Sequence, residues 1–119
     1  MVSFVHADVT HLSQAGVGED FQLIVDYGCL HGMSDHDRDL FVQEITAATA
    51  RGAPLSIVAF KPGGPVGPAA VVQTEIEHRF TPAWALLPAA DEQRWTPQGG
   101  LAERFAARFE PRNYVLQRR

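Results

Sequence analysis

Several kinds of residue and segment are scarce in this sequence, and their scarcity limits what the protein can be. Cys29 is the single cysteine, so no disulfide can form within the chain, and we expect a reducing, cytoplasmic setting. No apolar run approaches the ~20 residues that a membrane-spanning helix needs. The N-terminus also lacks the basic and apolar regions of a signal peptide. We therefore expect no membrane partner.

Positive charge is scarce as well. Lys61 is the single lysine among 10 basic residues, and the formal net charge is −4. Such a chain has no basic patch for a nucleic acid, so we expect no nucleic-acid partner. The apolar fraction of 45% is ordinary for a chain that builds a core. A length of 119 residues fits one domain at most, because domains usually run to roughly 100–150 residues.

The order of apolar patterns predicts an α/β fold. Alternating or continuous apolar runs predict strands over residues 2–7, 21–27, 54–60, 83–92 and 112–118. Helical spacing predicts helices over residues 34–52, 69–80 and 101–109. Strands that alternate with helices favour a parallel sheet, and the two closing strands favour an antiparallel partner. Pro88 cannot donate to a ladder, so its strand is expected at an edge or a bulge.

The first long helix has clear start and stop signals. Ser34 can cap it, and Asp37 three residues later completes a pair similar to a capping box. Gly52 suits the left-handed position that follows a helix. The apolar face expected to be buried carries Phe41, Ile45 and Ala48.

The most informative stretch is residues 21–33, which read FQLIVDYGCLHGM. Its nearly continuous apolar run is typical of a parallel strand that is covered on both faces. The small, turn-prone residues after it place Asp26, Tyr27, Gly28 and His31 at the carboxyl end of that strand. Ligands bind at this edge of open α/β sheets, so these residues are the candidates for a site.

Each candidate also has a structural interpretation. A buried Asp26 needs partners, which a ligand, a loop amide or an arginine could provide. His31 could take a proton from an acceptor hydroxyl, amine or thiol, or could be a hydrogen-bonded structural histidine. Cys29 is interpreted as a small, buried packing residue and not as a nucleophile. Residues 31–37 do not match a common zinc spacing, so no metal is expected.

Four segments together resemble the carboxyl-terminal two-thirds of a class I S-adenosylmethionine-dependent methyltransferase. FVHADVTHL resembles the family's third strand, and FQLIVDYGCLHGMSDHDRDLFVQEI resembles its fourth strand, active-site turn and following helix. GAPLSIVAF with its Gly/Pro loop resembles the fifth strand, and YVLQRR is similar to the final antiparallel strand. The resemblance implies a Rossmann-like mixed sheet in a single partial domain over residues 1–119. Its fourth, fifth, final and penultimate strands would be contiguous.

The resemblance also implies a function. It implies methyl transfer from S-adenosylmethionine to a small-molecule acceptor. Asp8 and Val9 would hold the adenine, whereas Asp26, Tyr27 and Gly28 would line the methionine part of the cofactor. His31 would orient or deprotonate the acceptor. For Asp8 the structural alternative is a cap of the turn that follows it.

The sequence departs from the family in one important respect. The GxGxG turn and the family's first two strands are absent from these 119 residues. A strand over residues 2–7 would then have no neighbour in the chain, and exposed strand edges recruit other chains. We therefore expect a homodimer or a complementing chain. The alternatives are a non-catalytic dimerisation or interaction module, and one half of a split methyltransferase.

Overall fold

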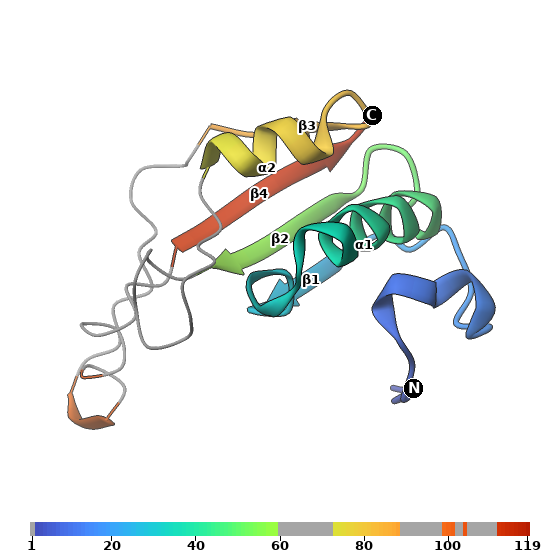
Figure 1. Ribbon diagram of the computed structural model, residues 1–119, viewed down its shortest axis with the longest axis horizontal. Coiled ribbons are helices and arrows are strands. Elements are labelled where there is room, and N and C mark those ends of the chain that lie inside the picture. The colour runs from blue at the N-terminus through green and yellow to red at the C-terminus, as the bar shows by residue number, and fades with distance from the viewer. Residues whose placement is uncertain (1, 60–72, 89–98, 102–103, 105–111) are drawn as a thin grey trace.

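The structure, a computed structural model, describes residues 2–59, 73–88, 99–101, 104 and 112–119 (Figure 1). These residues form one four-stranded sheet in the order β1-β2-β4-β3. The strands are β1 (Ile24–Tyr27), β2 (Pro54–Ala59), β3 (Trp84–Leu86) and β4 (Arg112–Arg118), and the helices are η1 (Val9–Gln14), η2 (Leu30–Gly32), α1 (Asp35–Ala48) and α2 (Gln73–Phe80). Among the described residues, no helix is both long enough and apolar enough to cross a membrane.

The sheet topology confirms the predicted α/β class and strand order. β1 and β2 are parallel, and β4 lies antiparallel to both β2 and β3. β3 is an edge strand, as expected for its segment. It ends at Leu86, however, so Pro88 lies beyond the strand. The predicted remainder over residues 89–92 lies outside the described residues.

Both α-helices pack on the same face of the sheet (Figure 1). β2 contributes Leu55, Ile57 and Ala59 to this face, and each of them is buried, in agreement with a period of two. Trp84 on β3 meets Phe80 of α2 edge-on, with ring centroids 6.0 Å apart. The indole nitrogen of Trp84 also donates to Thr46 Oγ1 at 2.8 Å, so core packing accounts for this residue fully.

Helix α1 begins where the sequence predicts and ends earlier. Ser34 Oγ accepts a hydrogen bond from the Asp37 backbone N–H at 3.2 Å, which confirms the N-cap. Phe41, Ile45 and Ala48 are buried as expected. The helix ends at Ala48, so Gly52 is not its C′ residue. Instead Gly52, with φ +85°, forms the turn that leads into β2.

The expected strand over residues 2–7 is wrong. The structure shows no strand in this segment, and Phe4 is 96% exposed. A strand needs a neighbour to pair its backbone groups, and none of the described strands adjoins these residues. The chain next forms η1, which packs on α1 through a hydrogen bond from the Ser13 hydroxyl to Glu44.

Strand β1 is also shorter and more exposed than expected. It begins at Ile24, and Phe21 makes only an isolated bridge to Thr49. Its side chains alternate between two environments. Asp26 is buried under the helices, whereas Val25 and Tyr27 are 61% and 66% exposed. The helices cover one face of β1 only, so the expectation of a strand covered on both faces is wrong.

Candidate functional site

The candidate site is built on the sharp turn that leaves β1. Gly28 has φ +84°, a conformation that side-chain-bearing residues rarely adopt. Its backbone N–H donates to Val58 O at 3.1 Å, which ties the turn to the carboxyl end of the parallel neighbour β2. The short helix η2 then carries the chain to the start of α1. This geometry places the turn at the sheet edge where the sequence predicts a ligand.

Asp26 holds the turn from the side of the strand. Its two carboxylate oxygens accept hydrogen bonds from the backbone N–H groups of Cys29 and Leu30, at 2.7 and 3.0 Å. Burial raises the pKa of the Asp26 carboxyl and outweighs the two amide hydrogen bonds, which lower it. The carboxylate therefore has the loop-amide partners that the sequence gives as its structural alternative.

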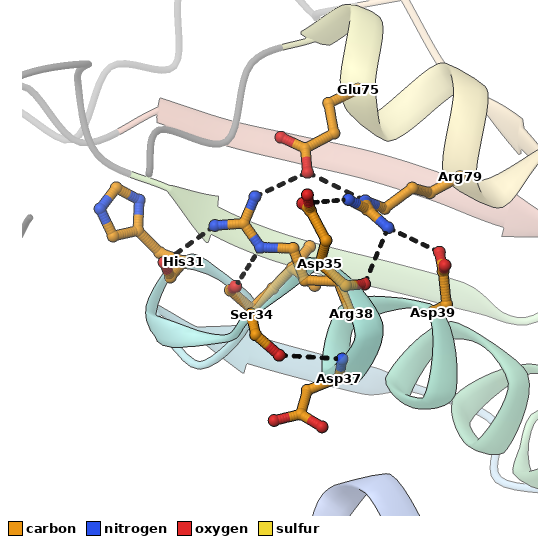
Figure 2. Close-up of polar contacts among 9 residues, drawn as sticks. His31, Ser34, Asp35, Asp37, Arg38, Asp39, Glu75 and Arg79 are labelled. Atoms are coloured by element: carbon orange, nitrogen blue, oxygen red, sulfur yellow. Dashed lines mark hydrogen bonds and ion pairs between the residues drawn. The ribbon is translucent and has the colours of Figure 1, made fainter. Parts of the chain in front are cut away.

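Arg38 of α1 holds the same turn through its carbonyl groups (Figure 2). Its Nε and Nη2 donate to the carbonyl oxygens of Leu30 and His31, at 3.1 and 3.0 Å. The side chain is only 3% exposed, which is unusual for an arginine. The turn is thus fixed through its N–H groups by a carboxylate and through its carbonyls by a guanidinium.

Sequence reasoning missed Arg38, although a signal for it is present. Residues at spacings of three, four and seven lie on one face of a helix. Counted from Arg38, those positions are occupied by Phe41, Val42 and Ile45, which are all buried. An arginine on a buried helical stripe needs fixed partners, and this pattern could have marked it.

A network of charges extends from Arg38 to α2. Arg38 Nη1 donates to Glu75 Oε1 at 2.6 Å, and the same oxygen accepts Arg79 Nε at 2.9 Å. Burial alone would raise the pKa of Glu75, but the hydrogen bonds and charges of the two arginines outweigh it and hold that pKa below its usual range. Arg79 also bonds Asp35 and Asp39 of α1. The network joins the two helices above the turn (Figure 2).

His31 lies on η2 and is 3% exposed. Burial lowers the pKa of its imidazole, the positive charge of Arg38 lowers it further, and Glu75 partly offsets this. These effects favour the neutral ring, which is the form that a general base requires. His31 thus lies next to the turn that Gly28 forms and that Asp26 holds.

Two neighbours of these residues face elsewhere. The Tyr27 side chain is exposed on the uncovered face of β1. Cys29 is exposed too, so the expectation of a buried packing cysteine is wrong. Desolvation and the negative charge of Asp26 raise the pKa of the Cys29 thiol. The thiol therefore stays protonated, which does not favour a nucleophile.

Asp8 and Val9 lie on a different element. Asp8 caps η1, where its Oδ1 accepts hydrogen bonds from the Thr10 N–H and hydroxyl, at 2.9 and 2.6 Å. The hydrogen bonds from Thr10 lower the pKa of the Asp8 carboxyl. η1 contacts the later part of α1 at Glu44, whereas the turn after β1 leads into the start of α1. Asp8 and Val9 therefore belong to a different local structure from Asp26, Gly28 and His31 (Figure 1).

The residues that the structure describes do not make a full cradle for S-adenosylmethionine. The carboxylates of Asp8 and Asp26 are engaged by their own neighbouring residues, and the sequence contains no GxGxG turn. Within the described part of the chain, what remains for a cofactor is the backbone around Gly28 at the carboxyl end of β1. Among the described residues, no group of three or more His, Cys, Asp or Glu side chains is placed to hold a metal ion.

Comparison with known proteins identifies the fold. No protein-family model and no curated protein matches the sequence. Solved structures do match, among them the N-methyltransferase NodS from Bradyrhizobium japonicum WM9, in complex with S-adenosyl-L-homocysteine. This match has a TM-score of 0.59 at 20% identity, and it covers 95% of this chain and 51% of NodS.

Two further matches agree with it. A protein from Nostoc punctiforme PCC 73102, provisionally assigned as an O-methyltransferase, has a TM-score of 0.62 at 14% identity over 96% of this chain and 36% of its own. An arsenic(III) S-adenosylmethionine methyltransferase from Chlamydomonas reinhardtii has a TM-score of 0.52 at 16% identity over 92% of this chain and 40% of its own. The chain thus spans about half or less of the length of these proteins. It has the fold of the corresponding part of a class I S-adenosylmethionine-dependent methyltransferase.

Proposed function

We propose that this chain supplies the acceptor side of a methyltransferase that transfers the methyl group of S-adenosylmethionine to a small molecule. The observation that supports this most is the turn after β1, which Asp26 and Arg38 fix at the ligand-binding edge of a methyltransferase fold. A rigidly placed reacting group is what catalysis by positioning needs. The expected setting is the cytoplasm.

The side chains suggest a division of roles. His31 would orient the acceptor or take its proton, because its environment favours the neutral imidazole. Asp26, Tyr27 and Gly28 would meet the methionine part of the cofactor through their backbone, since the Asp26 carboxylate already binds two amides. Asp8 and Val9 would reach the adenine only if the N-terminal segment repacks when the site is completed.

The partner that fits this function is a complementing chain. Within the described residues β1 pairs on one edge only, with β2, and its outer face exposes Val25 and Tyr27. A second copy could cover that face, but it would not bring the GxGxG turn that neither copy contains. A polypeptide with the remaining part of the fold would provide both. The similar solved structures support it, because each extends well beyond the part that this chain matches.

A non-catalytic dimerisation module is the second candidate. It is favoured by the exposed side chains of Val25 and Tyr27 on β1 and of Leu23 just before it, which is 59% exposed. Sedimentation analysis distinguishes the candidates. A stable homodimer that does not bind S-adenosylhomocysteine would support the module, and a monomer would contradict it.

Titration with S-adenosylhomocysteine tests the proposed function directly. The 119-residue chain is examined by calorimetry and by amide NMR, with adenosine as a control ligand. We expect weak binding, with a Kd of about 1 mM or about −4 kcal/mol, and shifts concentrated at residues 26–28. Adenosine should leave those amides unchanged, because it lacks the methionine part. No shift at these residues under saturating ligand would contradict the proposal.

A further inference from the structure

Arg38 connects helix α1 to the turn that carries His31 through several hydrogen bonds. Its guanidinium donates to two consecutive carbonyls, those of Leu30 and His31, and to the Glu75 carboxylate (Figure 2). These three acceptors come from a turn and from a second helix. A planar guanidinium can serve them together because its N–H groups point in fixed directions.

We propose that Arg38 is a positioning residue, which fixes the backbone of the turn so that the His31 imidazole is held at the carboxyl edge of the sheet. Glu75 completes the arrangement by fixing the third side of the guanidinium. This proposal rests on the proposed function, in which His31 orients the acceptor or takes its proton.

The two carbonyls belong to η2, so the hydrogen bonds from Arg38 fix the backbone at His31 as well as the start of α1. Leu30 O also accepts the Met33 N–H at 3.2 Å, so Arg38 Nε binds a carbonyl that closes η2. The His31 carbonyl belongs to the same peptide plane as the next residue's N–H, and Arg38 Nη2 fixes it. With Asp26 bonded to the amides on the strand side, the segment between Cys29 and Met33 has few remaining ways to move.

Electrostatics provide a signature that a purely structural role would not produce. The charged groups that act on the imidazole come from both helices packed over the turn. Arg38 of α1 lowers the pKa of His31, and Glu75 of α2 raises it, while burial gives the largest lowering. Removing Arg38 should therefore raise the His31 pKa, provided that the ring stays where it is.

The test is an NMR titration of the imidazoles in the full 119-residue chain, without cofactor, with His31 assigned from a His31→Gln variant. Arg38→Met removes both the hydrogen bonds and the charge, so we expect a higher His31 pKa. Arg38→Lys keeps the charge, but its donors all sit on one nitrogen and cannot reproduce the planar fork that reaches the three separate acceptors. It should shift the His31 ring signals and lower the hydrogen-exchange protection of the Met33 amide by about tenfold or more.

Ile45→Val is the matched control. Ile45 is buried on the same helix, away from the turn, so this variant loosens the core without touching the guanidinium. It should leave both the His31 titration and the Met33 protection unchanged. The proposal is overturned if Arg38→Lys leaves both signals as they are, or if Ile45→Val changes them equally. Because no cofactor is present, this result is independent of the titration with S-adenosylhomocysteine.

Discussion

Asp8 and Asp26 both accept hydrogen bonds from residues that follow them closely, yet their surroundings differ. Asp8 caps η1 at the surface, and the hydrogen bonds from Thr10 lower its pKa. Asp26 lies under the helices at 5% exposure, and burial raises its pKa in spite of two amide partners. Local hydrogen bonds thus favour the charged form of Asp8, whereas for Asp26 the loss of hydration outweighs them and disfavours the charged form.

Among the substitutions considered, Asp26→Ala should lower the stability of the fold the most. The backbone N–H groups of Cys29 and Leu30 would lose their partners, and at least the second is buried. We expect the free energy of unfolding in urea to fall by about 1–3 kcal/mol. Asp8→Ala is the matched control, and it should cost less because the Asp8 side chain is 64% exposed and its hydrogen bonds with Thr10 are only partly buried. Equal losses would mean that burial does not separate the two carboxylates.

The pH dependence of stability should have opposite signs for the two residues. The raised pKa of Asp26 means that the folded state holds this proton more tightly than the unfolded state does. The wild type should therefore lose stability, relative to Asp26→Asn, as pH rises from 3.8 through the raised pKa.

For Asp8 the lowered pKa adds stability above 3.8, and that stability is lost as pH falls through the lowered pKa. Comparison of wild type with Asp8→Asn over the same pH range measures it. The Asp8 effect should also weaken in high salt, because the group is exposed. Curves with the same sign for both residues would refute the comparison.

Tyr27→Ser should have the smallest effect, although Tyr27 follows Asp26 directly in the sequence. Its side chain is 66% exposed on the uncovered face, so we expect stability to change by no more than about 0.5 kcal/mol. Thermal unfolding of the isolated chain measures this. A large loss that depends on protein concentration would show instead that a second copy already covers this face.

The sequence predicts the elements whose signals are local or periodic. The strand segments of β2 and β4, the Ser34 cap and the buried stripe of α1 follow from alternation, helical spacing and capping chemistry. The order of the strands follows from the family resemblance together with the edge rule for Pro88. These features depend on residues that are close in sequence or on rules of sheet assembly.

Other features depend on contacts that a single sequence does not reveal. The segment over residues 2–7 has the alternation of a strand but no neighbour to pair with. The apolar run of β1 resembles a strand buried on both faces, although helices cover one face only. Arg38 bonds to Glu75, which lies 37 positions later in the chain, and the sequence alone does not show that these two residues meet. The roles of Asp8, Val9, Asp26, Tyr27, Gly28 and His31 in binding or catalysis stay predictions.

The central place of β4 has a consequence for synthesis. β2 and β3 share no ladder, and both pair with β4, which follows them in the chain. A ribosome that has released residues up to 88 has exposed the parallel pair β1–β2, but β3 still waits for its partner. The sheet can therefore close only after β4 has been made, and until then β3, which carries Trp84, has no partner among the described strands.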